Sequence, residues 1–316
     1  MPDKTKAQLE AELEELRAEV RHLRGELAQA FHVAYFDSLT ELPNRHGYDR
    51  YVEALRALSR TIDFQISLDH GRGGGILVAQ IDIDHFKDIN THLQHFGGDE
   101  VLRQFGHRIA GCTRANPITG DQPAGIAQRC LASLIVEQYL VKSGMTGSDL
   151  ISRWGGEEFF CIFPLCYRDS AAATAAYDDA DMIVRRLIDT VRREPFIVPV
   201  SDAIYEKIKQ NVLGNEKEYY RDAKLTDRKG KHVALPISAS VGYAVISWEE
   251  FIAKSKDDTA HLFRNVTDLL SRAKKMGRNR AVTVRAKAHD NKAAIHTYEG
   301  KALHKINTAD IAGFGA

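Results

Sequence analysis

The sequence predicts an α/β domain preceded by a long N-terminal helix. Three features predict this fold: a leucine repeat at helical spacing near the start, near-continuous apolar runs typical of buried strands, and amphipathic helical segments between those runs. The chain has 316 residues, of which 44% are hydrophobic, so it is long enough to bury a sizeable core. No apolar run approaches the roughly 18 residues of a membrane span, and the charged start has no apolar signal core.

Charge and cysteine content exclude several classes of protein. The 43 basic residues balance 43 acidic ones, which argues against a nucleic-acid-coating protein or a polybasic membrane binder. The four cysteines lack paired CxxC spacing, so we expect neither a disulfide framework nor a zinc site. We therefore expect a cytoplasmic protein whose partners include neither nucleic acid nor a membrane.

Residues 1–35 have the apolar spacing of a coiled coil. Apolar residues alternate at spacings of four and three, in the order Leu9, Leu13, Leu16, Val20, Leu23 and Leu27. A helix that is polar on its other faces is marginal alone and needs a partner. We predict a parallel two-stranded coiled coil and hence a homodimer. The alternative is a helix that packs on its own domain.

Strands and helices then alternate along the chain. Apolar runs predict strands over 76–83 and 237–246, and a Gly-Gly turn predicts a hairpin over 151–163. Helical spacing predicts helices over 99–111, 170–193 and 261–276. Residues near 113–145 and 197–235 interrupt this pattern as insertions in a domain spanning 36–286. Residues 287–316 form a weakly patterned tail of unknown role.

Two pairs of carboxylates are the first candidates for chemistry. Asp82 and Asp84 end an apolar strand on the same face, where desolvation and repulsion call for a compensating cation. Glu157 and Glu158 follow Gly156 and point to opposite faces, so we expect different roles for them. One aspartate and one glutamate suffice to hold magnesium through oxygen ligands. The alternative for each pair is a solvated turn.

Six short strings occur in the order typical of one family. They are DSLTELPNR (37–45), DIDHFKDIN (82–90), GGDEVL (97–102), RWGGEEF (153–159), SASVGYA (238–244) and AKKMGRNR (273–280). In this order they resemble the motifs of GGDEF-domain diguanylate cyclases, with GGEEF as a variant of the signature. The resemblance implies a ferredoxin-like, palm-type α+β fold with a central, mostly antiparallel sheet and surrounding helices.

The resemblance also implies an activity. Family members condense two GTP molecules into cyclic di-GMP and release two pyrophosphates, each 3′-hydroxyl attacking the other α-phosphorus. Two domains must therefore face each other, which fits an N-terminal coiled coil that supplies the second subunit at high effective concentration. The implied cofactor is magnesium, with manganese as the other candidate, because a divalent cation stabilises the charge of the transferring phosphates.

Metal and catalytic residues carry over from the family by position. Asp82 and Glu157 match the metal-binding carboxylates, and Ile83 matches the residue whose backbone carbonyl completes the shell. Glu158 matches the second acidic position, a candidate for helping to deprotonate the 3′-hydroxyl.

Phosphate contacts carry over in the same way. Phe86 and Lys87 fall in the turn whose backbone N–H groups cradle the phosphates. Lys274 and Arg278 match the basic pair that contacts them; without the resemblance, these two could be ordinary helix-terminal cations.

Guanine contacts complete the implied site. Asn90 and Asp99 match the pair that reads guanine, and Leu39 and Leu102 would line the base pocket. A carboxylate accepts from both N1–H and the exocyclic amine of guanine, a pattern that adenine lacks.

The sequence departs from the family pattern at several positions. The inhibitory RxxD motif keeps Asp149 but has Thr146 in place of arginine, so we predict weak or absent product inhibition there. Thr91 replaces an acidic residue and Gln94 replaces a glycine, both near the base pocket.

Two alternatives to an active diguanylate cyclase stay open. One is a catalytically inactive GTP-binding module, and the other is a related cyclase that makes another cyclic dinucleotide. An unidentified regulatory partner also stays open, because no sensory domain is recognisable before residue 36.

Overall fold

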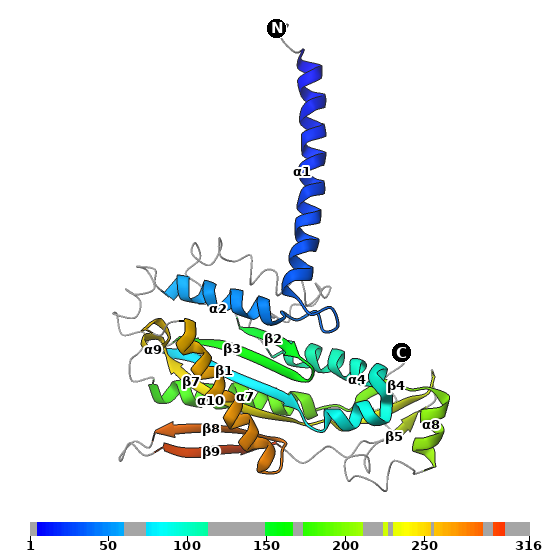
Figure 1. Ribbon diagram of the computed structural model, residues 1–316, viewed down its shortest axis with the longest axis vertical. Helices are drawn as coiled ribbons and strands as arrows, with labels where there is room; N and C mark the ends of the chain where they lie inside the picture. The colour runs from blue at the N-terminus through cyan, green and yellow to red at the C-terminus, as the bar shows by residue number, and fades with distance from the viewer. Residues whose placement is uncertain are drawn as a thin grey trace.

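A six-stranded sheet organises the body of the protein (Figure 1). The computed structural model describes residues 5–59, 74–112, 149–166, 173–210, 224–226, 230–253, 256–286 and 293–300. Within these residues the strand order is β2-β3-β1-β7-β8-β9. The strands are β1 (Gly74–Ile83), β2 (Leu150–Gly155), β3 (Glu158–Cys166), β7 (Ala239–Ser247), β8 (Arg280–Ala286) and β9 (Ala293–Glu299).

Helices cover both faces of this sheet. The helices nearest its core are α2 (Arg45–Ser59), α4 (Phe86–Ala110), α7 (Ala173–Arg192), α9 (Trp248–Ala253) and α10 (Lys256–Lys275). Along β1, Leu77, Ala79 and Ile81 belong to the core cluster that includes α4 and α7 residues. Ile76 and Val78 belong to the cluster that includes residues of α2, α9 and α10. This alternation is what a central strand requires when both of its faces are buried.

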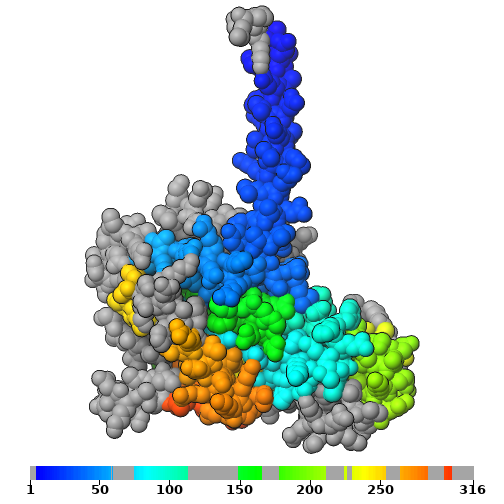
Figure 2. Space-filling model, viewed as in Figure 1, coloured from blue at the N-terminus to red at the C-terminus, as the bar shows by residue number. Residues whose placement is uncertain are grey.

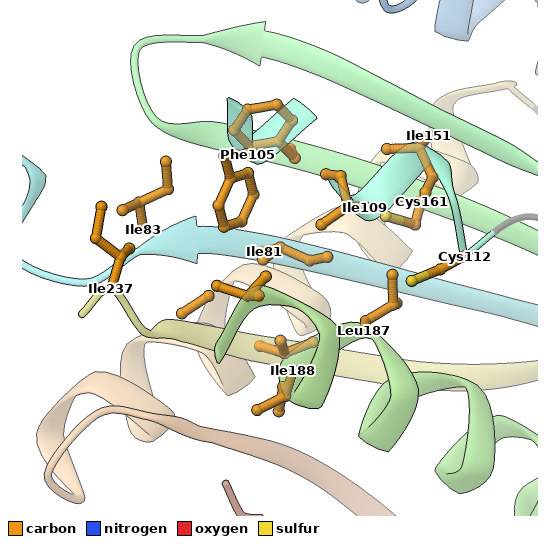
Figure 3. Close-up of a cluster of buried hydrophobic side chains, with 14 of the residues drawn as sticks. Ile81, Ile83, Phe105, Ile109, Cys112, Ile151, Cys161, Leu187, Ile188 and Ile237 are labelled. Carbon is orange, nitrogen blue, oxygen red and sulfur yellow. The ribbon is translucent and has the colours of Figure 1, made fainter. Parts of the chain in front are cut away.

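The larger of the two clusters packs between the sheet and helices α4 and α7 (Figure 3). Phe105 and Ile109 from α4 lie over Ile81 of β1, and Leu187 and Ile188 come from α7. Burying each such side chain contributes about 1.5–3 kcal/mol before conformational entropy is subtracted. The face of β1 that carries odd-numbered residues is therefore structural, and polar groups occur only toward the C-terminal end of its even-numbered face, at Gln80 and Asp82.

The predicted fold class is confirmed. β1 pairs antiparallel with both β3 and β7, and among the described strands only β7 and β8 pair in parallel. The hairpin predicted over 151–163 is β2 and β3, and the strand predicted over 237–246 is β7. The helix predicted over 99–111 is the second half of α4, which begins thirteen residues earlier at Phe86.

Part of the predicted insertion 197–235 folds as a small second sheet. Its strands are β4 (Phe196–Pro199), β5 (Lys224–Thr226) and β6 (His232–Leu235), in the order β4-β6-β5, with helix α8 (Asp202–Lys209) after β4. The Gln104 side chain of α4 donates to the Ile197 carbonyl at 2.6 Å and accepts from its N–H at 3.2 Å. This sheet is thereby fixed to α4. The other predicted insertion, 113–145, lies outside the described residues.

The main sheet includes a strand from the segment that was predicted to be a tail. β9, from the predicted tail, pairs antiparallel with β8 from Ala286↔Ala293 to Arg280↔Glu299. The Tyr298 hydroxyl donates to Asp189 of α7, at 3.2 Å to either carboxylate oxygen. β9 is therefore an integral strand of the main sheet.

Helix α1 (Lys6–Tyr35) projects away from this body (Figure 2). Thr5 and Gln8 form a capping box at its start. The six apolar residues of the predicted seam are 45–69% exposed, so their apolar surface is not covered by this chain. None of the described helices is long and apolar enough to cross a membrane.

Candidate active site

Three acidic side chains gather where β1 ends and β3 begins. Asp82 lies directly opposite Glu158 in the β1–β3 register. Glu157 lies in the turn between β2 and β3, where Gly155 and Gly156 have φ values of 155° and 51°. Glycine readily adopts the left-handed backbone found at Gly156, which explains the Gly-Gly pair at this sharp turn. The hairpin thus brings both glutamates beside Asp82.

Asp82 is the electrostatic centre of the site. Its side chain is buried, and its carboxylate pairs with the Lys274 ammonium of α10 at 2.7 Å. Burial raises the pKa of Asp82 to about 6, since the Lys274 contact that lowers the pKa is opposed by the negative charges of Glu157 and Asp84. One lysine therefore does not fully compensate this group of carboxylates. Additional positive charge would stabilise the ionised form of Asp82.

The donor set suits a cation that arrives with phosphates. Among the described residues, no group of three or more His, Cys, Asp or Glu side chains is arranged to hold a metal ion. Mg²⁺ keeps several waters and is usually bound by one or two carboxylates together with substrate phosphates. Asp82, with a neighbouring glutamate and the Ile83 carbonyl, fits that pattern, whereas a closed, all-protein metal cage is not present in the described part of the chain.

Glu158 has a buried positioning partner that sequence reasoning missed. Gln80, two residues before Asp82 on the same face of β1, is 2% exposed. Its amide nitrogen donates to the Glu158 carboxylate at 3.4 Å, and its amide oxygen accepts from the Thr267 hydroxyl of α10 at 2.8 Å. A buried amide is costly unless it is hydrogen-bonded. A lone glutamine inside the apolar run 76–83 was the available signal.

Hydrogen bonds satisfy the carboxylate of Asp84. The sequence grouped Asp84 with Asp82 as an acidic pair in need of a compensating charge, but Asp84 matches no ligand position of the family. The Ser238 and Ser240 hydroxyls donate to it at 2.7 and 2.6 Å, and the Asn279 backbone N–H donates at 2.9 Å. These donors come from the segment before β7, from β7 itself and from the turn after α10.

The structure places Asn90, which is expected to read guanine, next to the residue that precedes Asp99. Gly98 lies so close to Asn90 that a Cβ at residue 98 would sit 1.8 Å from the Asn90 amide oxygen. This approach places Asn90 beside the second half of α4, which carries Asp99. α4 is interrupted at Gln94, whose φ of 62° and ψ of 176° lie in a region that is almost exclusive to glycine. The glycine-to-glutamine departure therefore coincides with a strained backbone.

The two leucines expected to line the base pocket are placed differently. Leu102 is 3% exposed within the main core cluster, and Leu39 is partly buried against that cluster. Leu39 is therefore the more available of the two for contact with a base.

The residues expected to contact phosphate lie at the start of α4 and at the end of α10. α4 begins at Phe86 after His85, whose φ is 59° and which makes no side-chain capping bond. The first N–H groups of a helix lack partners within the helix and favour anions. Phe86 is buried and anchors this end, while Lys87 is exposed. Lys274 and Arg278 lie in the last turn of α10 and just beyond it.

A second link missed from sequence joins the DSLTELPNR string to the signature hairpin. Asp37 accepts two hydrogen bonds from one Arg153 guanidinium nitrogen, at 2.9 and 3.1 Å, and two more from the Thr40 backbone and hydroxyl. Arg153 also donates to the Gly156 carbonyl at 3.0 Å. The loop that follows α1 is thus tied to the turn that carries Glu157. Both partners occur in the six strings, but their separation in sequence hides the pairing.

Of the altered RxxD positions, one lies in the described part of the chain. Asp149 is 5% exposed just before β2, while residue 146 lies outside the described residues.

The chain is similar to known proteins, and the part matched by a family model includes Asp82, Asn90 and Asp99. The family described as "Diguanylate cyclase, GGDEF domain" matches residues 34–120. The chain is 32% identical to diguanylate cyclase DgcP of Pseudomonas aeruginosa over 145 residues, which cover 43% of this chain and 15% of DgcP. It is 33% identical to diguanylate cyclase TpbB of the same species over 182 residues, covering 57% of this chain and 31% of TpbB. The chain thus spans less than a third of either relative.

A solved structure supports the fold. The coiled coil and GGDEF domain of DgcB from Caulobacter crescentus, in complex with c-di-GMP, is 22% identical with a TM-score of 0.50. The match covers 87% of this chain and 98% of that chain. The expected architecture, a mostly antiparallel sheet with surrounding helices and a preceding long helix, is therefore confirmed.

Proposed function

We propose that the chain is a diguanylate cyclase of the GGDEF domain family, which condenses two GTP molecules into cyclic di-GMP and two pyrophosphates. The observation that carries this proposal is the pairing of Asp82 opposite Glu158, with Glu157 adjacent and Lys274 bonded to Asp82. Carboxylates and a lysine at the end of β1 and the start of β3 suit phosphoryl transfer, in which positioning and charge stabilisation supply most of the catalysis.

We assign the cation to Asp82, Glu157 and the Ile83 carbonyl. When bound, Mg²⁺ would neutralise phosphate charge and orient the α-phosphorus. The position of Glu158 directly opposite Asp82 makes it a further ligand candidate. This incompletely compensated acidic group, in which Glu157 and Asp84 lie near Asp82 and burial raises the Asp82 pKa to about 6, is the structural reason to expect divalent-metal dependence.

Lys274 would change partners when the substrate binds. In the structure its ammonium is 2.7 Å from Asp82, the carboxylate that we assign to the cation. A divalent cation on Asp82 would repel Lys274, and the GTP phosphates would offer it a new anionic partner. Lys274 therefore compensates Asp82 before binding and contacts phosphate afterwards. Arg278, four residues later, would reach the same phosphates.

Glu158 is the candidate to accept the 3′-hydroxyl proton. Its side chain is exposed at the start of β3, and the Gln80 amide donates to it. The oxygen freed of its proton attacks the α-phosphorus of the GTP held by the second subunit, and pyrophosphate leaves. Asn90 and Asp99 would select guanine over adenine on each subunit.

The second subunit would be supplied by α1. Its uncovered seam of leucine and valine requires a partner helix. A parallel homodimer places two identical bodies at the same end of the coiled coil, as a reaction between two half-sites requires. We also propose that product inhibition by cyclic di-GMP through residues 146–149 is weak or absent, because threonine replaces the phosphate-binding arginine.

The experiment is a pyrophosphate-release assay on the purified protein with GTP, in Mg²⁺ and in EDTA, with ATP in parallel. We expect release from GTP that requires the divalent cation and that excess ATP does not suppress. Equal release from GTP and ATP would instead favour a cyclase with another cyclic dinucleotide product. No release from either nucleotide would contradict the proposed enzyme.

A further inference from the structure

The turn between α10 and β8 holds its backbone in an unfavourable conformation. Gly277, Arg278 and Asn279 have φ values of 111°, 62° and 51°. Glycine adopts such values readily, but residues with a Cβ do so rarely. Two consecutive non-glycine residues in this region persist only where their surroundings determine the backbone, a situation that is concentrated at functional sites.

Hydrogen bonds fix this turn from four directions. The Arg278 N–H donates to the Ala273 carbonyl at 3.1 Å, and the Arg280 side chain donates to the Arg278 carbonyl at 3.0 Å. The Asn279 N–H donates to Asp84 at 2.9 Å, while the Asn279 carbonyl accepts from the Gly300 N–H at 2.9 Å. The backbone on both sides of the Arg278 side chain is therefore held in place.

Asp84 is the buried anchor of this arrangement. It is 1% exposed, and besides Asn279 it binds the hydroxyls of Ser238 and Ser240. Hydrogen bonds to a charged group are among the stronger ones. One carboxylate at the end of β1 thus joins the start of β7 to the turn after α10. It lies two residues from Asp82, so the turn is fixed relative to the proposed cation site.

Gly300 closes the turn from the opposite side. A Cβ on Gly300 would sit 2.6 Å from the Asn279 amide oxygen and 2.7 Å from an Arg192 guanidinium nitrogen. β9 ends at Glu299, immediately before this glycine. The added strand therefore delivers a close backbone contact to the Arg278–Asn279 turn, and a Cβ at residue 300 would displace the Asn279 or Arg192 side chain.

The side chain carried by this turn is available for an anion. Within the described residues no carboxylate forms an ion pair with Arg278, whereas Lys274 on the preceding helical turn is paired with Asp82. A fixed backbone that presents an uncompensated guanidinium near a nucleotide site is a preorganised anion contact.

We propose that Asp84 and the β9–Gly300 contact are positioning elements that aim Arg278 at the phosphates of GTP. Neither residue touches the nucleotide; each acts through the backbone of the turn. The proposal rests on the proposed function for the identity of the ligand. It assigns a role to Asp84, to Ser238 and Ser240, and to β9. None of these has a part in the reaction itself.

Nucleotide binding, measured apart from turnover, tests this proposal. The probe is 3′-deoxy-GTP with Mg²⁺, which lacks the attacking hydroxyl, and its affinity is measured by calorimetry. The full chain is compared with Gly300→Ala and Asp84→Asn, each alone and combined with Arg278→Ala. Gly25→Ala is the matched control, since a Cβ there meets nothing within 4 Å. Thermal unfolding verifies that each variant is folded at the assay temperature.

We expect Gly300→Ala and Asp84→Asn each to weaken binding of 3′-deoxy-GTP about tenfold. A hydrogen bond to a charged group typically contributes a somewhat larger factor, so this loss corresponds to a weakened contact. In protein that already carries Arg278→Ala, neither substitution should weaken nucleotide binding further, because the contact between Arg278 and the phosphates is already lost. A general structural role would give equal losses in both backgrounds and would overturn the proposal. So would unchanged affinity in folded Gly300→Ala protein, or no binding of the probe by the native protein. Binding without turnover would refute the cyclase alone.

Discussion

Replacing Asp37 with asparagine should separate the loop after α1 from the signature hairpin while changing the side-chain volume little. The Asp37 and Arg153 side chains are 24% and 12% exposed, so the pair lies between a surface pair and a buried one. Surface pairs contribute about 0–1 kcal/mol, and breaking a buried pair costs about 3–5 kcal/mol. For this two-oxygen contact we expect Asp37→Asn to lower the free energy of unfolding by about 2 kcal/mol at pH 7.

The pH dependence follows from the pKa of the same carboxyl. Burial raises the pKa of Asp37, but hydrogen bonds from Thr40 and Arg153 outweigh burial and hold the pKa below its ordinary value of 3.8. A carboxyl with a lowered folded-state pKa contributes stability above its unfolded pKa, and that stability is lost as pH falls through the folded value. The difference between native and Asp37→Asn protein should therefore be constant above about pH 5 and shrink below pH 4.

Urea unfolding at several pH values measures both effects. Glu299→Gln serves as the control, because its partner Arg280 is mostly buried but Glu299 is 73% exposed, and it should change stability by less than about 0.5 kcal/mol. A double-mutant cycle with Arg153→Met should give a coupling energy of about 1–2 kcal/mol. A coupling near zero would refute the reasoning that this pair ties the two segments together.

Three further perturbations give separate outcomes. Gln94→Gly should raise the melting temperature by about 2–4 °C, because glycine adopts this backbone conformation without strain. Gln94→Ala keeps the Cβ and should not raise the melting temperature. A lower melting temperature for Gln94→Gly would contradict the inferred strain. Ser240→Ala should cost about 1–2 kcal/mol in urea unfolding because Asp84 loses a charge-assisted hydrogen bond, and an unchanged midpoint would argue against this bond. Leu16→Glu combined with Leu23→Glu should make the protein monomeric in sedimentation and abolish cyclase activity at micromolar concentration; a dimer that survives would place the interface elsewhere.

The sequence was sufficient for the elements whose signals are local. β1 and the signature hairpin were predictable because an apolar run and a Gly-Gly turn act over a few neighbouring residues. The sequence also identified position 94 as a departure from the family, because glutamine stands where the family has glycine. β4 and β6 were not predicted, because their short apolar stretches are lost within a mainly polar segment.

Contacts between distant residues account for the remainder. Asp84 received no firm role from the sequence, because its hydrogen-bond donors lie 154, 156 and 195 residues later in the chain. Arg153 lies 116 residues from Asp37, and Thr267 lies 187 residues from Gln80. Neither periodicity nor spacing identifies which polar groups meet across such separations. The candidate site was therefore predictable as a set of residue types, whereas the hydrogen bonds that position those residues required the structure.

The most direct test of the central claim is the identity of the product. Purified native protein and a Glu158→Ala variant are incubated with GTP and Mg²⁺, and the nucleotides are resolved by chromatography and mass. Cyclic di-GMP from the native protein and none from Glu158→Ala is the predicted result, and it would place the chemistry at the signature hairpin. Intact GTP in the presence of native protein that binds it would contradict the claim and indicate a nucleotide-binding module without the reaction.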